Sequence, residues 1–579
     1  MGPTKIETEA PAESIRDQFR DLWSIVLRPK AKRSLSAFAG AITVVIALNA
    51  IAQIRLNDWQ GSIYDAIGRK DLSVFLHEVM VFLILVSILL CLGVAQTWLH
   101  EMLKVRLRET VTNDLLDEWL KPRRVFQLKQ SGDISANPDQ RVQDDARRLT
   151  ELTVDLAVGL VQSTFLLIAF IGVLWELSDQ VVFVIGGKNV MIPGYMVWTA
   201  IAYSIVGSTI TWFVGRPLID AHTELRAREA DFRFSLVRVS ESADEIALFG
   251  GENEEKRYIG TRVHALIETM RHIANRLAGL TWVTGGYGWL AILVPLLLAA
   301  PGYFGGTLTL GGLMMVVGAF YQVQSALRWF VDKFPTIAEW RAMLARIMLY
   351  RTALLQLPKR GKLPGIRHEK GGAEISVENL FVSWNGDAPL KVPNFKVAAG
   401  ERVLIEATPK SGKSTFHMAL AGLWNRGCGT VRLPANARIL FLPQPPYLPM
   451  GSLRTALAYP DPPERFLDED VKAALKRVNL GGFVPALDKV RRWDKELTLD
   501  ERRRLVIGRM LLHRPDWVVE DESVYELDEE SRQAAMDIFR DELKHTAVLS
   551  IGRRHPEGTF YQRILVLRDH DPQEATPAS

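Results

Sequence analysis

The sequence has very little cysteine and almost no net charge. Its 579 residues include only two cysteines, Cys91 and Cys428, which excludes a disulfide framework and a metal site built from several cysteines. Lysine and arginine number 70 against 66 acidic residues, so the formal net charge of +4 gives no support for a nucleic-acid-binding protein. Residues 1–33 are charged and lack the short apolar core of a secretory signal, so we expect none.

Charged residues are absent from five long stretches in the first part of the chain. Four of the stretches have the length of one membrane-spanning helix, about 20 residues. The fifth has room for two helices joined at the turn Pro301–Gly306. A buried helix of a soluble protein also lacks charge, but five such runs favour six membrane spans. The stretches are 34–54, 79–100, 156–175, 189–215 and 277–327.

Lysine and arginine alternate between the segments that connect these stretches. Segments 1–33, 101–155 and 216–276 hold seven, ten and ten lysines and arginines. Segments 55–70, 176–188 and 301–309 hold three, one and none. Because basic residues stay on the cytoplasmic side of a membrane, we predict that both termini and the two long loops are cytoplasmic.

The two long cytoplasmic loops look like continuations of the spans. Residues 99–120 have apolar spacing typical of a helix. Each loop contains a break, at 132–141 in the first and at Phe249–Glu252 in the second. Each break is either a contact point for a soluble domain or an ordinary turn, and the sequence leaves both open.

The composition changes after residue 345. Segment 346–370 is a linker that contains Pro358, Gly361, Pro364 and Gly365. Short β-rich runs then alternate with helical patterns, which predicts an α/β domain with a largely parallel sheet. The expected strands are 373–380, 401–406, 438–442, 517–520 and 547–551. The expected domains are 1–33 (cytoplasmic segment), 34–345 (six spans with two long loops), 346–370 (linker), 371–569 (α/β domain) and 570–579 (tail).

Residues 403–415 form a phosphate-binding motif. The pattern GxxxxGK[ST] is matched except that Ala407 replaces the first glycine, and Gly412, Lys413, Ser414 and Thr415 complete it. Backbone N–H groups cradle phosphates, the lysine reaches the β- and γ-phosphates, and the hydroxyl binds Mg²⁺. Such a motif needs a strand before it and a helix after it, and the surrounding residues predict both.

A second nucleotide motif follows in the expected order. The apolar strand 517–520 ends in Asp521 and Glu522. Asp521 can hold Mg²⁺, and Glu522 can polarise the attacking water. Either motif alone is weak, but the pair in this order predicts a nucleotide-binding fold.

Four more segments lie between or after these motifs: 441–444, 497–502, 525–528 and 548–553. Their order resembles the ATPase of ABC transporters, with a Q-loop, a signature, a D-loop and an H-loop. The resemblance implies ATP and Mg²⁺ as cofactors. It implies Glu522, Gln444 and Arg553 as catalytic residues, Ser414, Gln444 and Asp521 as metal ligands, and nucleotide contacts at Ala407, Lys410, Ser411, Gly412, Lys413, Ser414, Thr415, Thr498, Asp500 and Asp528.

Several segments are similar to one branch of this family, the SbmA/BacA-type permeases fused to an ATPase and the peroxisomal fatty-acid transporters (ABCD type). They include 48–49, 56–60, 64–66, 137–141, 228–233, 421–424 and 442–449, and the similarity covers about residues 20–568. The resemblance implies a membrane α-helical, exporter-like fold of six spans plus an α/β nucleotide-binding domain. It also implies a half-transporter that dimerises, as a homodimer or with a related half, in the bacterial inner membrane.

The sequence departs from the family around the γ-phosphate. Ala407 and Lys410 stand where the family usually has glycine, so the phosphate cradle is expected to be distorted. Asp500 replaces a signature glycine and would repel phosphate unless it turns away or finds a cation. Arg553 replaces the H-loop histidine, and Glu520 puts a carboxylate into an apolar strand. These changes indicate slow hydrolysis or ATP binding alone, or compensation by an Asp500–Arg553 pair across the dimer, or ordinary activity despite them.

The resemblance implies uptake of hydrophilic solutes such as peptides or cobalamin-like molecules. The alternatives are a proton-coupled permease with a regulatory nucleotide-binding domain, a regulatory ATP-binding protein without transport, and a fatty-acyl transporter. Candidate proton carriers, which are also ordinary salt-bridge candidates, are Asp155, Glu176, Glu224 and Glu229. Polar residues within the spans either solvate a solute or bond between helices; they are Gln96, Gln162, Tyr203, Tyr287, Gln322 and Gln324.

Overall fold

The computed structural model describes most of the chain. The described residues are 15–26, 28–129, 138–179, 181, 183–185, 188–190, 192–360, 365–383, 390–407, 412–521, 527–552 and 560–567. They form two compact units. The first is made of Glu9–Lys121 and Ser131–Leu355, and the second of Pro122–Gln130 and Gln356–Ser579.

Six helical segments in the described part of the chain are long and apolar enough to cross a membrane, which confirms the six predicted spans. A helix satisfies its own backbone groups, so charge-free stretches in lipid must be helical. The longest helix has 53 residues and is about 80 Å long. A bilayer core is only about 30 Å thick, so this helix extends far beyond it. The segments are α2 (Pro29–Arg69), α3 (Leu72–Trp119), α6 (Ala146–Asp179), α7 (Tyr195–Glu241), α9 (Glu252–Phe304), and α10 (Leu310–Asp332) followed by α11 (Phe334–Arg360).

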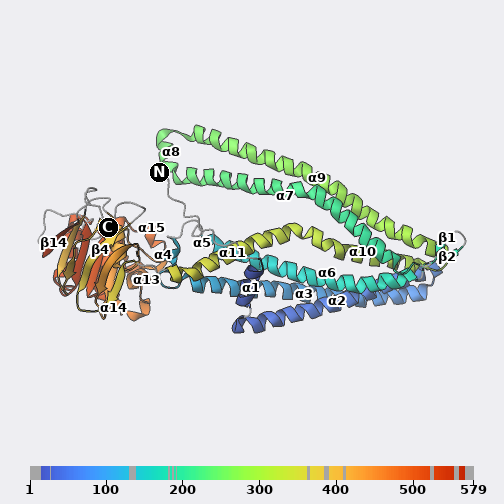
Figure 1. Ribbon diagram of the computed structural model, residues 1–579, viewed down its shortest axis with the longest axis horizontal. Helices are drawn as coiled ribbons and strands as arrows, with labels where there is room; N and C mark the ends of the chain where they lie inside the picture. Colours follow the sequence, from blue (N-terminus) through green and yellow to red (C-terminus); the bar gives the residue numbers. More distant parts are fainter. Residues whose placement is uncertain are drawn as a thin grey trace, which may run out of the picture. The chain divides into compact units, whose positions relative to one another are not determined.

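The spans pack as pairs inside the first unit. α2 and α3 form one hairpin, α7 and α9 form another, and α10 packs on α6 and α2 (Figure 1). Phe170, Leu174 and Phe320 are fully buried between helices. The expected break in the second loop is present, because α8 (Ala243–Phe249) ends at Gly250, whose φ is +64°. Short elements complete this part: α1 (Ile15–Val26), α5 (Pro138–Gln140), a π-helix (Arg141–Asp145), β1 (Phe183–Ile185) and β2 (Lys188–Val190). The short helix α4 (Arg124–Lys129) belongs to the second unit.

The second unit is built around a parallel five-stranded sheet with the order β14-β7-β13-β12-β9. The strands are β7 (Arg402–Ala407), β9 (Ile439–Leu442), β12 (Trp517–Asp521), β13 (Ala547–Gly552) and β14 (Arg563–Leu567). β12 and β13 are buried along their whole length, as apolar runs predict for a sheet covered on both faces. The expected α/β domain with a parallel core sheet is therefore confirmed.

A second sheet and several helices complete this unit. The sheet has the order β3-β8-β4-β5, with β6 also paired to β4. The first half of segment 346–370 continues α11 as a helix up to Arg360. The remaining elements are β3 (Arg367–Lys370), β4 (Ile375–Val382), β5 (Leu390–Lys391), β6 (Phe395–Val397), α12 (Lys413–Leu420), β8 (Gly427–Leu433), β10 (Gly451–Ser452), α13 (Leu453–Ala458), α14 (Asp468–Arg477), β11 (Val490–Arg491), α15 (Trp493–Glu496), α16 (Leu499–His513), α17 (Glu529–Arg540) and two 3-10 turns at Pro463–Arg465 and Gly481–Ala486.

Candidate functional site

The phosphate-binding motif lies between β7 and α12. β7 buries Val403 and Ile405 and ends at Ala407, and α12 begins at Lys413. Gly412 has a φ of +83°, a left-handed conformation that a side chain disfavours. The first N–H groups of an α-helix have no carbonyl partner within it, so this helix start suits a phosphate.

Strand β12 brings a carboxylate to the same helix. Asp521 is 3% exposed, and its Oδ2 accepts a hydrogen bond from Oγ of Ser414 at 2.8 Å. β12 and β7 are not neighbours, because β13 lies between them, so only the sheet brings the two motifs together. Hydroxyl and carboxylate oxygens are ligands that Mg²⁺ prefers.

Gln444 follows strand β9 at the same edge of the sheet. β9 pairs in parallel with β12, and Leu442 lies beside Glu520 in the register. Parallel strands end at a common edge, so Gln444 and Asp521 leave the sheet on the same side. The Gln444 side chain is exposed. Its amide oxygen is a further candidate ligand beside the Ser414–Asp521 pair.

The unusual carboxylate of Glu520 is buried and has a donor. It is 1% exposed, and its Oε1 accepts a hydrogen bond from Oγ of Ser550 at 2.6 Å. Ser550 is its register partner on β13. The expected cost of an unpaired buried carboxylate is therefore reduced by this bond.

Asp500 has a cation on its own helix. Nε of Arg504 lies 3.0 Å from Oδ2 of Asp500, one helical turn apart on α16. Arg504 also donates to the carbonyl of Asn479 at 3.2 Å. Arg504 is therefore the cation that Asp500 needs if its carboxylate is not to repel a phosphate. Thr498 caps the same helix in a capping box with Glu501.

Asp528 caps the next helix, α17. Its Oδ1 accepts a hydrogen bond from the Ser531 N–H at 2.8 Å. This bond, together with hydrogen bonds to the Ser531 hydroxyl and to the Asp500 carboxyl and a smaller effect of the positive charge of Arg504, holds the pKa of Asp528 below its usual value against the opposing effect of burial. The carboxylate therefore stays ionised at neutral pH and acts first as a helix cap.

Four predicted site residues lie outside the described residues: Lys410, Ser411, Glu522 and Arg553. Their roles remain predictions, and so does the Asp500–Arg553 pair across a dimer. The structure brings together Ser414 and Asp521, and it places Gln444 at the same sheet edge.

Arg509 is a buried cation that the sequence reasoning missed. It is 6% exposed, donates to the carbonyls of Ala456 at 2.7 Å and of Tyr447 at 3.2 Å, and burial lowers its pKa to about 10. It therefore ties the signature helix α16 to the segment that follows Gln444. A signal was present, because Arg509 lies four residues after the buried Leu505, on the face that a helix directs to the core.

Five amide side chains form a chain of hydrogen bonds across four membrane helices. Nε2 of Gln322 donates to Gln53 at 3.2 Å, and Nε2 of Gln53 donates to Asn49 at 3.0 Å. Nδ2 of Asn49 donates to Gln96 at 3.2 Å, and Nε2 of Gln96 donates to Gln162 at 3.1 Å. We call these residues the amide chain. The sequence left two roles open for Gln96, Gln162 and Gln322, which were to solvate a solute or to bond between helices. The structure shows bonds between helices for all three residues.

Two of the candidate proton carriers lie in ion pairs. Asp155 is 2.9 Å from both Nε2 of His100 and Nζ of Lys104. Glu224 is 3.3 Å from Arg228 on the same helix. Both arrangements match the ordinary salt bridges that the sequence kept as the alternative.

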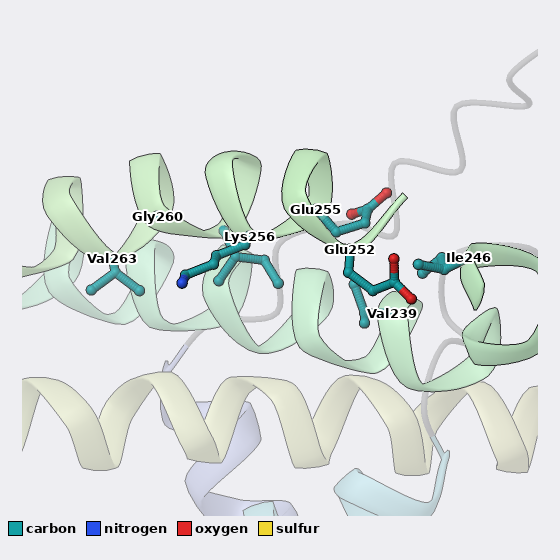
Figure 2. Close-up of a pocket in the computed structure, with 8 residues that line it drawn as sticks. Val239, Ile246, Glu252, Glu255, Lys256, Gly260 and Val263 are labelled. Atoms are coloured by element: carbon teal, nitrogen blue, oxygen red, sulfur yellow. The ribbon is translucent and has the colours of Figure 1, made fainter. Parts of the chain in front are cut away.

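The tip of the second long loop presents an apolar surface. Leu248 and Phe249 on α8 are 86% and 89% exposed. A cavity of about 470 Å³ lies between α7, α8 and α9, with Val239, Ile246 and Val263 among its lining residues (Figure 2). Large exposed apolar side chains beside a cavity are typical of a protein–protein contact.

Comparison with known proteins identifies the class. Residues 22–304 match the family model described as ABC transporter transmembrane region 2. The chain is 28% identical to the inner membrane ABC transporter ATP-binding protein YddA of Escherichia coli, over 91% of this chain and 92% of that protein. It is 25% identical to ABC transporter D family member 2, chloroplastic, of Arabidopsis thaliana, over 88% and 80% of the two chains. It is 23% identical to ATP-binding cassette sub-family D member 3 of Homo sapiens, over 83% and 77%.

A solved structure shares the fold. The structure of a bacterial Atm1-family ABC exporter with ATP bound superposes with a TM-score of 0.71 and 18% identity, covering 92% of this chain and 94% of that one. Fold, motifs and relatives define an ABC half-transporter, a membrane domain fused to an ATPase domain. The chain is similar to ABC transporters, with relatives that include D-family proteins, as the resemblance implied.

Proposed function

We propose that this half-transporter binds and hydrolyses ATP to move a solute across the membrane. The observation that carries the proposal is the 2.8 Å bond between Ser414 and Asp521, which joins the two nucleotide motifs. Lys413 and the first N–H groups of α12 hold the β- and γ-phosphates. Glu522 acts as the general base on the attacking water.

The residues at the sheet edge fit a magnesium ion. Ser414, Asp521 and Gln444 offer a hydroxyl, a carboxylate and an amide oxygen, and Mg²⁺ takes oxygen ligands. These three residues would hold the ion, and the ion would supply positive charge that offsets the negative charge developing on the phosphates. The chain contributes the buried Asp521 and the capping conformation at Gly412.

Hydrolysis is proposed to be slow. Ala407 stands in the phosphate-binding motif in place of glycine, and Arg553 cannot deprotonate as the usual histidine can. Arg504 reduces the repulsion between Asp500 and a phosphate, so the site retains turnover. The slow hydrolysis is therefore attributed to Ala407 in the phosphate-binding motif and to Arg553.

The transported solute is proposed to be hydrophilic, such as a peptide or a cobalamin-like molecule, taken up across a bacterial inner membrane with both termini in the cytoplasm. The basic residues in the long loops support this orientation. The amides of the amide chain are half-buried and give the spans a polar element. Proton coupling has less support, because Asp155 and Glu224 are paired with cations.

The working unit is proposed to be a homodimer. A signature sequence faces the ATP of a second ATPase domain in this family, so one chain has an incomplete site. The exposed Leu248 and Phe249 at the end of α8 suit a contact with the ATPase domain of the partner.

Transport by the purified protein in proteoliposomes tests the proposal. Vanadate-sensitive ATP hydrolysis and ATP-dependent entry of a labelled hydrophilic peptide are expected, and Glu522→Gln should abolish both. Fatty acyl-coenzyme A and cyanocobalamin serve as alternative solutes. Flux that survives Glu522→Gln but collapses with a protonophore would overturn ATP coupling in favour of proton coupling.

A further inference from the structure

Arg509 carries a buried positive charge that carbonyl groups satisfy in place of a carboxylate. Its side chain is 6% exposed, and among the described residues no carboxylate forms an ion pair with it. Taking a charge out of water is costly, and buried charges are normally paired with an opposite charge. Because ionisable groups that are perturbed by burial cluster at functional sites, Arg509 is a candidate for a role in the nucleotide site.

The guanidinium of Arg509 joins three parts of the ATPase unit. Its Nη2 donates to the carbonyl of Ala456 in α13 at 2.7 Å and to the carbonyl of Tyr447 at 3.2 Å, and its Nε also donates to Ala456 at 3.2 Å. Its Cζ lies 5.4 Å from the centre of the Tyr459 ring, which packs edge-on against the Tyr447 ring. One side chain of α16 therefore holds α13 and the segment around Tyr447.

The segment between Tyr447 and Gln444 has little conformational freedom. Its sequence is Gln444-Pro445-Pro446-Tyr447. Each proline fixes its own φ near −65° and also restricts the residue before it. The position of the Tyr447 carbonyl therefore limits where Gln444 can lie, although Arg509 does not contact Gln444 itself.

Helix α16 connects Arg509 to the signature. The helix is capped by Thr498 and carries Asp500 in its first turn, and Arg509 lies nine residues further on, or about 14 Å along the axis. Arg509 thus lies between two predicted nucleotide contacts, the Mg²⁺ ligand Gln444 and the signature residue Asp500. Its bonds fix the Gln444 segment against the helix that carries the signature.

We propose that Arg509 is a positioning residue for ATP hydrolysis, which holds Gln444 where its amide oxygen reaches the Mg²⁺ ion beside Ser414 and Asp521. The inference rests on the proposed function, because it concerns the same site. Arg509 acts through the Tyr447 carbonyl and not through contact with the ion. Its loss should therefore weaken the use of Mg²⁺ more than the binding of the nucleotide.

A Mg²⁺ titration of nucleotide binding tests this proposal without requiring hydrolysis. The full-length protein binds a fluorescent ATP analogue, and the emission is followed as Mg²⁺ is added. Arg509→Met removes the guanidinium and leaves an adaptable apolar side chain in the buried position. The Mg²⁺ concentration for half-maximal response should rise about 10-fold, as is typical when the support of a metal ligand is removed. Binding of the analogue at saturating Mg²⁺ should stay at the wild-type level.

His513→Gln is the matched control. His513 lies one turn further along α16, is 5% exposed, and has its Nε2 2.9 Å from the carbonyl of Ala458 at the end of α13. It therefore joins α16 to α13 without contacting the Gln444 segment, and its variant should keep the wild-type Mg²⁺ response.

Two further variants separate positioning from simple destabilisation. Arg509→Lys keeps the charge and one donor, so it should recover part of the Mg²⁺ response, and it decides the test if Arg509→Met does not fold. Gln444→Ala should raise the Mg²⁺ requirement by itself. The double variant Arg509→Met/Gln444→Ala should then match Gln444→Ala alone, because Arg509 acts through Gln444.

The outcomes distinguish this proposal from the proposed function. A wild-type Mg²⁺ response in the Arg509 variants, an equal shift in His513→Gln, or additive shifts in the double variant would overturn the role of Arg509. A Mg²⁺ response that depends on Arg509, in a wild-type protein that never hydrolyses ATP, would overturn the proposed function and leave that role standing. Hydrolysis with a Mg²⁺ response that is independent of Arg509 would do the reverse.

Discussion

The Asp500–Arg504 pair predicts that Arg504→Ala impairs ATP hydrolysis through the charge it leaves behind. At 3.0 Å and an effective dielectric constant near 20, the attraction within the pair is about 5 kcal/mol. A carboxylate about 4 Å from a phosphate charge is repelled by about 4 kcal/mol on the same scale. Because the opposite charges of Asp500 and Arg504 sum to zero, the pair presents little net charge to a phosphate, whereas Asp500 alone presents all of its own.

The observable effect is smaller than either Coulomb energy. Solvent reaches 27% of the Asp500 side chain and 20% of the Arg504 side chain, and it screens both interactions. We expect Arg504→Ala to cost about 1–3 kcal/mol in transition-state stabilisation, or about 5- to 150-fold in rate. The double variant Asp500→Gly/Arg504→Ala should recover most of that loss, because it removes the unpaired carboxylate.

Vanadate-sensitive ATPase rates of the four proteins in this cycle measure the coupling. Arg465→Ala is the matched control, since Arg465 also pairs with an aspartate four residues away, Asp461, in the same domain. It should leave the rate within about twofold. Additive effects of Asp500→Gly and Arg504→Ala would refute the reasoning. Coupling of Asp500→Gly to Arg553→His instead would place the partner of Asp500 across the dimer.

Three further predictions follow from buried polar contacts. Ser550→Ala removes a hydrogen-bond donor of the buried Glu520, so unfolding by denaturant should show a loss of about 1–3 kcal/mol that Glu520→Gln in the same background reduces. Burial lowers the pKa of His417, so the unfolded chain binds a proton more readily than the folded chain does. The free energy of unfolding should therefore fall as the pH drops below 6.5 and recover above it. The same dependence of melting temperature on pH in wild type and His417→Gln would contradict this. Gln96→Leu breaks two bonds of the amide chain and Gln162→Leu breaks one, so the first should lower the thermal stability of the membrane domain about twice as much, at about 0.6 kcal/mol per bond; equal effects would argue against the chain.

The local signals in the sequence were sufficient for the architecture. Spans could be read from charge-free stretches because lipid forces every apolar stretch of that length into a helix. The strands before Ala407 and Asp521 could be read because a parallel sheet buries near-continuous apolar runs. The reversal at Gly250 could be predicted from the glycine itself, because glycine readily adopts the left-handed conformation that ends α8.

The hydrogen-bond and ion-pair partners of polar side chains could not be predicted from local sequence signals. Glu520 looked costly until the register of β12 and β13 placed Ser550 beside it. Asp500 needed a cation, and only the helix geometry showed that Arg504 lies beside it.

The sequence by itself therefore determined what kind of protein this is: six spans, an ATPase domain, and the motifs that would hold ATP. The tertiary structure alone decided which charges and amides meet, because contacts such as Ser414 with Asp521, or Gln53 with Gln322, join residues far apart in the chain. Hydropathy and local motifs act over a few residues and survive in a linear sequence. Hydrogen bonds and ion pairs depend on ångström-scale placement, which only the packed sheet and helices supply.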